Sequence, residues 1–176
     1  MGLPLVVSEY RERKILKRFK VTPISPVVLL MVEFLIYVIY SAVSLATVIS
    51  VAMLFWKVEI HGSWIAFVGS WLLTMISTLS IGMMVGGIAK NAKTASVIAC
   101  VLYFPMLIFS GTTLPFEVMP ETMKKTVRLF PMTQGIQLMK AAFLGVPIQN
   151  VWLPVLVMLS ITVVCFSVAV KYFKWE

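Results

Sequence analysis

Charged residues are scarce in this chain, at 12% of 176 residues, whereas a soluble domain carries about a quarter. Acidic residues are the scarcer kind, with 7 Asp and Glu against 15 Lys and Arg, and 60% of the residues are hydrophobic. This composition excludes an ordinary soluble domain and predicts an integral membrane protein. The net charge of +8 does not indicate nucleic-acid binding, because most basic residues flank apolar runs, where the positive-inside rule places them.

Residues that build catalytic and metal sites are also few. His61 is the only histidine, which excludes sites built on a histidine pair. Cys100 and Cys165 each lie inside an apolar run, where a cysteine behaves as a small hydrophobe. The segment Gly87–Thr94 nearly matches a phosphate-binding loop, but it lies between two apolar runs rather than between a strand and a helix. We therefore expect no catalytic residue, metal site or cofactor on this chain.

Long apolar runs dominate the rest of the sequence. They predict an all-α polytopic membrane protein, a single membrane domain over residues 1–176. Its four transmembrane helices are expected at 25–56, 63–89, 94–110 and 151–170, the third interrupted by Pro105. Most Lys and Arg residues fall on the side of the N-terminal segment, which places both termini in the cytoplasm. The expected location is therefore the cytoplasmic membrane.

The most densely charged segment, 9–23, precedes the first span and has the pattern of a short basic helix. Ile15, Leu16 and Phe19 share one face, and Thr22-Pro23 ends the helix, because a residue before proline avoids helical dihedral angles. One interpretation is a topological signal that binds anionic lipid. The other is a helix that docks on a protein partner in the cytoplasm.

A long connection, 111–150, separates the third and fourth spans, and four prolines divide it. Between them lie two helix candidates, Glu121–Phe130 and Gln134–Leu144, the second with Thr133 as N-cap and Gly145 as its end. Each is too short to cross a bilayer. We expect them to dip into the outer leaflet and return, or to lie along the interface.

Polar residues inside the spans are candidate functional residues. Glu33 is the only acidic one, and it either snorkels inward, pairs with a basic residue such as Arg18, or serves a coupling ion. Hydroxyl stripes are formed by Ser41, Ser44 and Thr47 on the first span and by Ser70, Thr74 and Ser77 on the second. Such stripes either make interhelical hydrogen bonds or line a substrate path. Gly82 and Gly86, four residues apart, predict close helix packing.

Two motifs resemble permease subunits of type-2 ABC transporters. The first is Glu12-Arg13-Lys14-Ile15-Leu16-Lys17-Arg18-Phe19-Lys20-Val21-Thr22-Pro23, which is similar to the family's cytoplasmic coupling helix. The second is Phe109-Ser110-Gly111-Thr112-Thr113-Leu114-Pro115-Phe116, followed by Met119-Pro120 and Leu129–Thr133, and it resembles the external re-entrant hairpin before the last helix. The family has six membrane helices with the coupling helix after the second. The chain therefore resembles roughly the last two thirds of a permease, and we expect a truncated, split or shortened form.

This resemblance implies a non-catalytic subunit of an ATP-driven exporter that moves an amphiphile, such as a drug, lipid, peptide or glycan. The implied partners are cytoplasmic ABC ATPase subunits, which carry the ATP and Mg, and a second permease copy or paralogue that completes a dimer. The implied ATPase contacts are Glu12, Arg13, Leu16, Lys17, Phe19, Thr22 and Pro23. The implied external hairpin includes Gly111, Pro115, Pro120 and Pro131.

Two alternatives come from other classes of protein. One is a non-transporting membrane protein, such as an immunity or regulatory partner derived from a permease fragment. The other is an interfacial lipid-binding protein that uses the basic helix alone, for which binding would collapse with salt.

Overall fold

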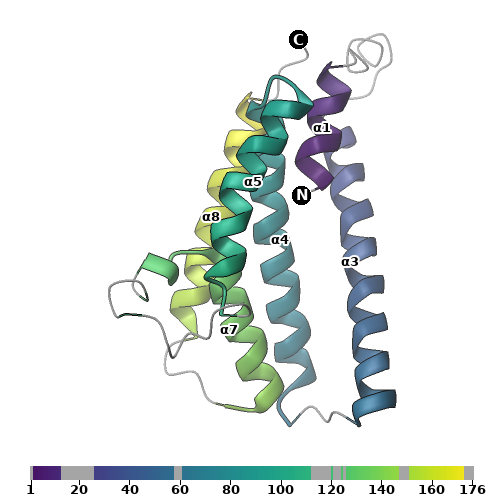
Figure 1. The fold of residues 1–176 in the computed structure, drawn as a ribbon, viewed down its shortest axis with the longest axis vertical. Coiled ribbons are helices and arrows are strands. Elements are labelled where there is room, and N and C mark those ends of the chain that lie inside the picture. Colours follow the sequence, from purple (N-terminus) through teal and green to yellow (C-terminus); the bar gives the residue numbers. More distant parts are fainter. Residues whose placement is uncertain are drawn as a thin grey trace.

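The computed structural model describes residues 2–12, 26–57, 61–111, 120, 124, 126–146 and 151–172. The helices, in chain order, are α1 (Gly2–Glu12), α3 (Pro26–Trp56), α4 (Trp64–Ile88), α5 (Ala92–Ile108), α7 (Pro131–Leu144) and α8 (Trp152–Tyr172). No strand occurs among the described residues, which confirms the all-α fold class for that part of the chain. In the bundle α4 contacts every other helix, while α3 stands at one edge (Figure 1).

Three helices contain apolar stretches long enough to cross a membrane, namely Met31–Trp56, Trp64–Ile88 and Trp152–Lys171. They correspond closely to the predicted spans 25–56, 63–89 and 151–170. The fourth predicted span, 94–110, is the shorter helix α5. Its 17 residues extend about 25 Å at 1.5 Å per residue, against the roughly 30 Å of a bilayer core. The described residues thus form three candidate spans and one shorter apolar helix rather than four full-length spans.

Polar caps set where α4 and α5 begin. Ser63 accepts a hydrogen bond from the Ala66 amide at 3.4 Å, and Asn91 accepts one from the Thr94 amide at 2.7 Å. Each cap satisfies an amide that has no partner within its own helix. Pro105 lies inside α5 rather than at its end, so the expected interruption does not break the helix there.

Helix α1 packs tightly against two glycines of α4. A Cβ atom at Gly86 would lie 2.9 Å from the Val7 Cβ atom, and one at Gly82 would lie 3.3 Å from the Pro4 Cδ atom. Leu3 and Val7 are buried together with Met83 of α4 and Ala169 of α8. The predicted close packing at the glycine pair is therefore confirmed, and its partner is a helix of the same chain.

The predicted basic helix 9–23 coincides only partly with described residues. Glu9–Glu12 are the last residues of α1 and continue the helix that begins at Gly2, so the expected start at residue 9 is wrong. The predicted ATPase contacts Arg13, Leu16, Lys17, Phe19, Thr22 and Pro23 lie outside the described residues, as does Pro115 of the predicted hairpin.

Helix α7 begins three residues before its predicted start. Pro131 occupies the first turn and Phe130 is the N-cap, without a side-chain hydrogen bond, because proline's fixed φ suits the first helical position. Thr133 is therefore not the N-cap. It is buried, and its hydroxyl donates to the Phe109 carbonyl at 3.5 Å. Gly145 ends the helix in the left-handed region at φ 70°, as predicted.

The rest of the predicted hairpin is described only in part. Of the candidate helix Glu121–Phe130, residues 124 and 126–130 are described. The Lys124 amide donates to the Pro120 carbonyl at 3.0 Å, and the Arg128 amide donates to the Lys124 carbonyl at 3.1 Å. Helix α7 packs beside the lower half of α4, with Gln134 and Leu138 buried, rather than along the bundle's outer surface (Figure 1). The re-entrant hairpin itself stays a prediction.

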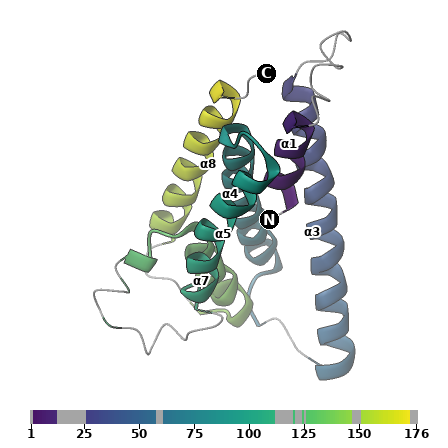
Figure 2. The same ribbon diagram turned by 45° about the horizontal axis from the view of Figure 1, so that its top comes forward.

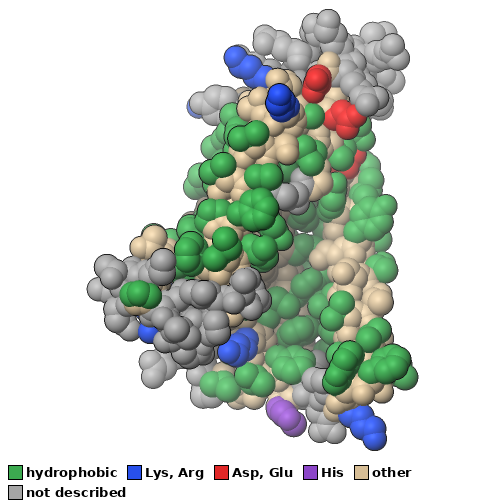
Figure 3. All heavy atoms as spheres, in the orientation of Figure 1, with side chains coloured by type: hydrophobic (Ala, Val, Ile, Leu, Met, Phe, Trp, Pro, Cys, Tyr) green, Lys and Arg blue, Asp and Glu red, His purple; other side chains and the backbone are tan. Residues whose placement is uncertain are grey.

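The bundle has two distinct ends. At the upper end in Figure 1 lie the C-terminal end of α1, the α4–α5 turn and the C-terminal end of α8, and Figure 2 shows the same grouping. At the lower end, the Gly62 amide donates to the Phe143 carbonyl at 3.3 Å, which joins the α3–α4 connection to α7. Between the ends, hydrophobic side chains cover most of the visible surface (Figure 3).

Candidate functional site

A cavity of about 570 Å³ lies between α3 and the group formed by α4, α5 and α7, with Pro4 of α1 at its wall. We call it the lateral cavity. Figure 3 shows its opening between α3 and the rest of the bundle. Its position is a consequence of loose packing by α3, which contacts the bundle less extensively than α8 does.

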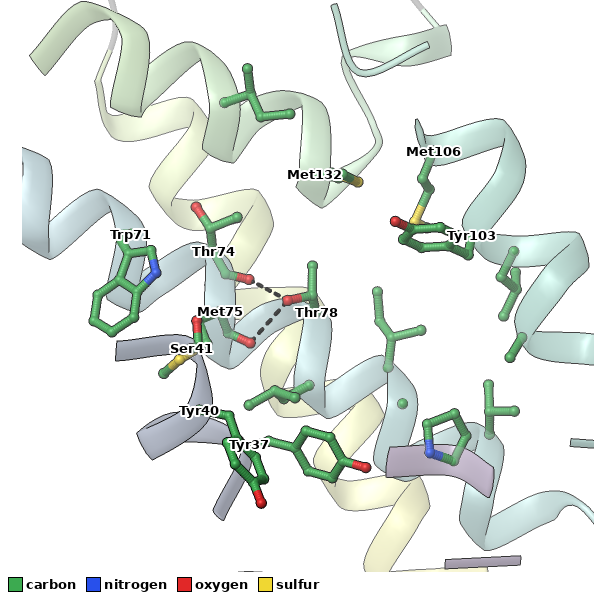
Figure 4. A pocket seen from close by; sticks show the side chains of 18 residues that line it. Tyr37, Tyr40, Ser41, Trp71, Thr74, Met75, Thr78, Tyr103, Met106 and Met132 are labelled. Carbon is green, nitrogen blue, oxygen red and sulfur yellow. Dashed lines mark hydrogen bonds between the residues drawn. The ribbon is translucent and has the colours of Figure 1, made fainter. Parts of the chain in front are cut away.

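The lining is aromatic, thioether and aliphatic, and six of its side chains carry a hydroxyl group, three of them tyrosines (Figure 4). The labelled lining residues are Tyr37, Tyr40, Ser41, Trp71, Thr74, Met75, Thr78, Tyr103, Met106 and Met132. None of the described side chains that line the cavity carries a formal charge. Cavities of this size with apolar walls and a few polar groups are typical of small-molecule sites.

Two of the hydroxyls in the wall donate to the backbone of their own helix. Thr78 donates to the carbonyl of Thr74 at 2.8 Å and to that of Met75 at 3.0 Å, and Thr74 donates to the Ser70 carbonyl at 2.6 Å. Since each proton is used within the helix, these oxygens face the cavity as acceptors. These two oxygens can accept from a ligand, while the tyrosine hydroxyls and the Trp71 indole N–H in the same lining can donate to one. The wall is therefore suited to an apolar ligand that carries a few polar groups.

The structure brings together only part of the predicted substrate path. Ser41 and Thr74 line the lateral cavity, whereas Ser44, Ser70 and Ser77 do not. Ser70 donates to the Ala66 carbonyl at 2.7 Å. Ser77 is buried and donates to the Met158 carbonyl of α8 at 3.4 Å, which is the interhelical alternative. Sequence reasoning did not single out the aromatic and methionine side chains of the wall, because such residues occur throughout the apolar runs.

The last turn of α1 makes two polar contacts with other helices. The Tyr10 hydroxyl donates to Glu33 Oε1 of α3 at 2.8 Å. The amide of Ala92, the first residue of α5, donates to Glu12 Oε2 at 3.0 Å. Glu33 thus has a phenol as its described partner. Arg18, the basic partner suggested by the sequence, lies outside the described residues.

No group of three or more His, Cys, Asp and Glu side chains with the spacing of a metal site occurs in the described ranges.

Three residues of the predicted external hairpin are described. Gly111, at φ 89°, follows the end of α5. Pro120 is exposed, and Pro131 is buried at the start of α7.

Comparisons with known proteins agree on one family. The family model described as "ABC-2 family transporter protein" matches residues 1–171. The chain is 25% identical over 169 residues to the inner membrane transport permease YhhJ of Escherichia coli K12, which covers 93% of this chain and 44% of that protein. It is 29% identical over 97 residues to Nodulation protein J of Rhizobium leguminosarum bv. viciae, covering 55% of this chain and 38% of that protein.

The chain spans less than half the length of these curated relatives. No solved structure matches it. Because the family model covers nearly the whole chain, the protein belongs to the ABC-2 family of transporter proteins.

Proposed function

We propose that the chain is the transmembrane permease part of an ATP-driven exporter, with its upper end in the cytoplasm. Its substrate is an amphiphile, and the lateral cavity receives the apolar portion of that substrate. ATP and Mg act on a separate ATPase chain. Membership of the transporter family and similarity to an inner membrane transport permease support this function.

The observation that carries the proposal is the uncharged wall of the lateral cavity. A charged solute would lose its hydration there without finding a counter-charge, which is costly in a medium of low dielectric constant. An apolar chain or ring loses nothing comparable, and the flexible methionine side chains of the wall adapt to varied shapes. The cavity opens toward the side of the bundle (Figure 3), from which a lipid-dissolved molecule can enter.

The proposed sidedness depends on the basic residues. Lys90 and Lys93 flank Ala92, the first residue of α5, whose amide donates to Glu12 at the end of α1. Residues 13–25, which follow α1 in the sequence, contain five more Lys and Arg residues. The positive-inside rule assigns such residues to the cytoplasm, where the ATPase partner acts. A second permease copy or paralogue completes the proposed assembly.

Co-purification tests the ATPase partner. A tagged chain is isolated from native membranes, together with the variants Leu16→Asp and Phe19→Asp, which place a charge on the apolar face of the predicted helix. We expect an ATPase subunit with the unaltered chain and little or none with either variant. If the unaltered chain brings down no ATPase, a non-transporting membrane protein is favoured. Salt-sensitive vesicle binding without an ATPase would favour the interfacial lipid-binding protein.

A matched pair of variants tests the cavity. Ser41→Phe adds a bulky side chain to the wall formed by α3, whereas Ser44→Phe adds the same side chain three residues on, at an exposed position outside the lining. We expect amphiphile export, and stimulation of the ATPase by the amphiphile, to fall for Ser41→Phe and to stay near the original level for Ser44→Phe. If export and ATPase stimulation were equal in the two variants, the lateral cavity would not be part of the transport path.

A further inference from the structure

The last turn of α1 lies between α3 and α5, which form two walls of the lateral cavity (Figures 1 and 2). The contacts of that turn point in different directions. Tyr10 reaches α3 through Glu33, and Glu12 reaches α5 through Ala92. The body of α1 is held by α4, where Val7 and Pro4 meet Gly86 and Gly82. One short helix is therefore attached to three others.

The contact with α3 matters because α3 has few others. Its apolar stretch has no buried residue within the described part of the chain, and it packs only lightly on α1 and α4. Glu33 is the only acidic residue in that stretch. A carboxylate near lipid requires a hydrogen-bond donor, and the Tyr10 hydroxyl supplies one at 2.8 Å. Removing the hydroxyl therefore removes a polar attachment of α3 at the upper end.

The contact with α5 differs from an ordinary local cap. Asn91 already caps the helix by accepting from Thr94. Glu12 accepts from the amide of Ala92, 80 residues away in sequence, and a carboxylate at this position also interacts favourably with the helix dipole. Glu12 therefore supplies a tertiary attachment that the sequence of α5 alone does not provide.

We propose that Tyr10 and Glu12 act together as a brace that fixes the separation of α3 and α5 at the upper end, and so sets the width of the lateral cavity. The basic segment 13–25 joins the end of this brace to the start of α3. This inference rests on the proposed function, in which a movement of α1 caused by the ATPase would reach both cavity walls through Tyr10 and Glu12. Both are positioning residues, and Glu12 acts through Ala92; the ATPase contact predicted for Glu12 stays a prediction.

The separation of the two walls is measured by double electron–electron resonance on the full chain in lipid nanodiscs. Cys100 and Cys165 are first replaced by serine. Spin labels are placed at exposed positions, Val32 on α3 and Val97 on α5. We expect Tyr10→Phe combined with Glu12→Ala to lengthen the mean distance between these labels by on the order of 3 Å, one hydrogen-bond length, and to broaden its distribution.

A second label pair controls for general loss of structure. Ile65 on α4 and Leu153 on α8 are exposed and lie on two helices that pack extensively on each other. Their separation is expected to stay unchanged in the double variant. A change in both pairs would mean that the bundle has loosened as a whole. In that case the single variant Tyr10→Phe is measured instead, because it removes only one oxygen atom. A longer α3–α5 distance in this variant supports the brace, and an unchanged distance contradicts it.

Conservative replacements of Glu12 separate the brace from a charge effect. Glu12→Gln keeps an oxygen that accepts from the Ala92 amide, whereas Glu12→Ala keeps none. We expect the α3–α5 distance to be nearly unchanged in the Gln variant and lengthened in the Ala variant.

Two results would overturn the brace. They are an unchanged α3–α5 distance in the double variant, and equal effects of Glu12→Gln and Glu12→Ala. None of these measurements requires an ATPase or a substrate. A chain that shows the distance changes but captures no ATPase would retain the brace and refute the proposed function.

Discussion

The close approach of α1 to α4 at Gly86 predicts a specific loss of stability. In Gly86→Ala the new Cβ atom would lie 2.9 Å from the Val7 Cβ atom and 3.0 Å from its Cγ1 atom, so the two helices must separate. Overpacking of this kind costs about 1–3 kcal/mol. Alanine also favours a helix over glycine by about 0.5–1 kcal/mol, which partly masks the cost.

Gly69→Ala provides the matched control. Gly69 lies on the same helix, and a Cβ atom there meets nothing within 4 Å, so this variant gains the helix preference without the clash. The difference between the two variants isolates the clash, at about 1–3 kcal/mol. For a chain of this length that corresponds to roughly 2–12 °C in the midpoint of thermal unfolding.

The assay is thermal unfolding of the purified protein in one detergent, with both variants measured side by side. Val7→Ala removes the Cγ1 atom from the contact but keeps the Cβ atom, so Gly86→Ala should cost somewhat less stability in a Val7→Ala background than in the original chain. A midpoint for Gly86→Ala equal to that of Gly69→Ala would refute the packing of α1 on the glycine face.

Further predictions concern the α7 region. In Gly135→Ala the new Cβ atom would overlap the side chain of Thr74, so thermal unfolding should show a loss of stability of about 1–3 kcal/mol. Adding Thr74→Ala should recover part of that loss. A Gly135→Ala variant with full stability would contradict the α4–α7 contact. In Gly145→Ala the left-handed φ of 70° costs about 1–2 kcal/mol, and the His61 carbonyl at 3.2 Å adds to the loss. Gly111→Ala shares the left-handed strain, at φ 89°, but meets no atom within 4 Å, so its midpoint should fall by less than that of Gly145→Ala.

Much of the helical architecture follows from local patterns in the sequence. Short polar stretches of sequence separate the long apolar runs, so α4 begins at Trp64, one residue after the expected 63, and α5 begins at Ala92, two residues before the expected 94. The end of α7 at Gly145 follows from glycine's access to the left-handed region. These features depend on neighbours in the chain, so the sequence alone predicts them.

Other features depend on contacts between distant residues. Residues 2–7 are apolar and few, and only the glycine face of α4 shows why they form a packed helix. The partner of Glu33 is 23 residues away, and the helix that Glu12 meets begins 80 residues away. A threonine before an apolar run resembles an N-cap, yet Pro131 starts α7 earlier and leaves Thr133 buried beside Phe109. No periodic pattern encodes such pairs.

The sidedness of the upper end tests the central claim of this account most directly. In a chain without Cys100 and Cys165, single cysteines replace Lys93 at the upper end and Lys57 at the lower end, both of which are exposed. We predict that a membrane-impermeant maleimide labels Lys57→Cys in intact cells and labels Lys93→Cys only after the membrane is permeabilised. Labelling of Lys93→Cys in intact cells would place the end that is meant to meet the ATPase outside the cell, and would contradict the account.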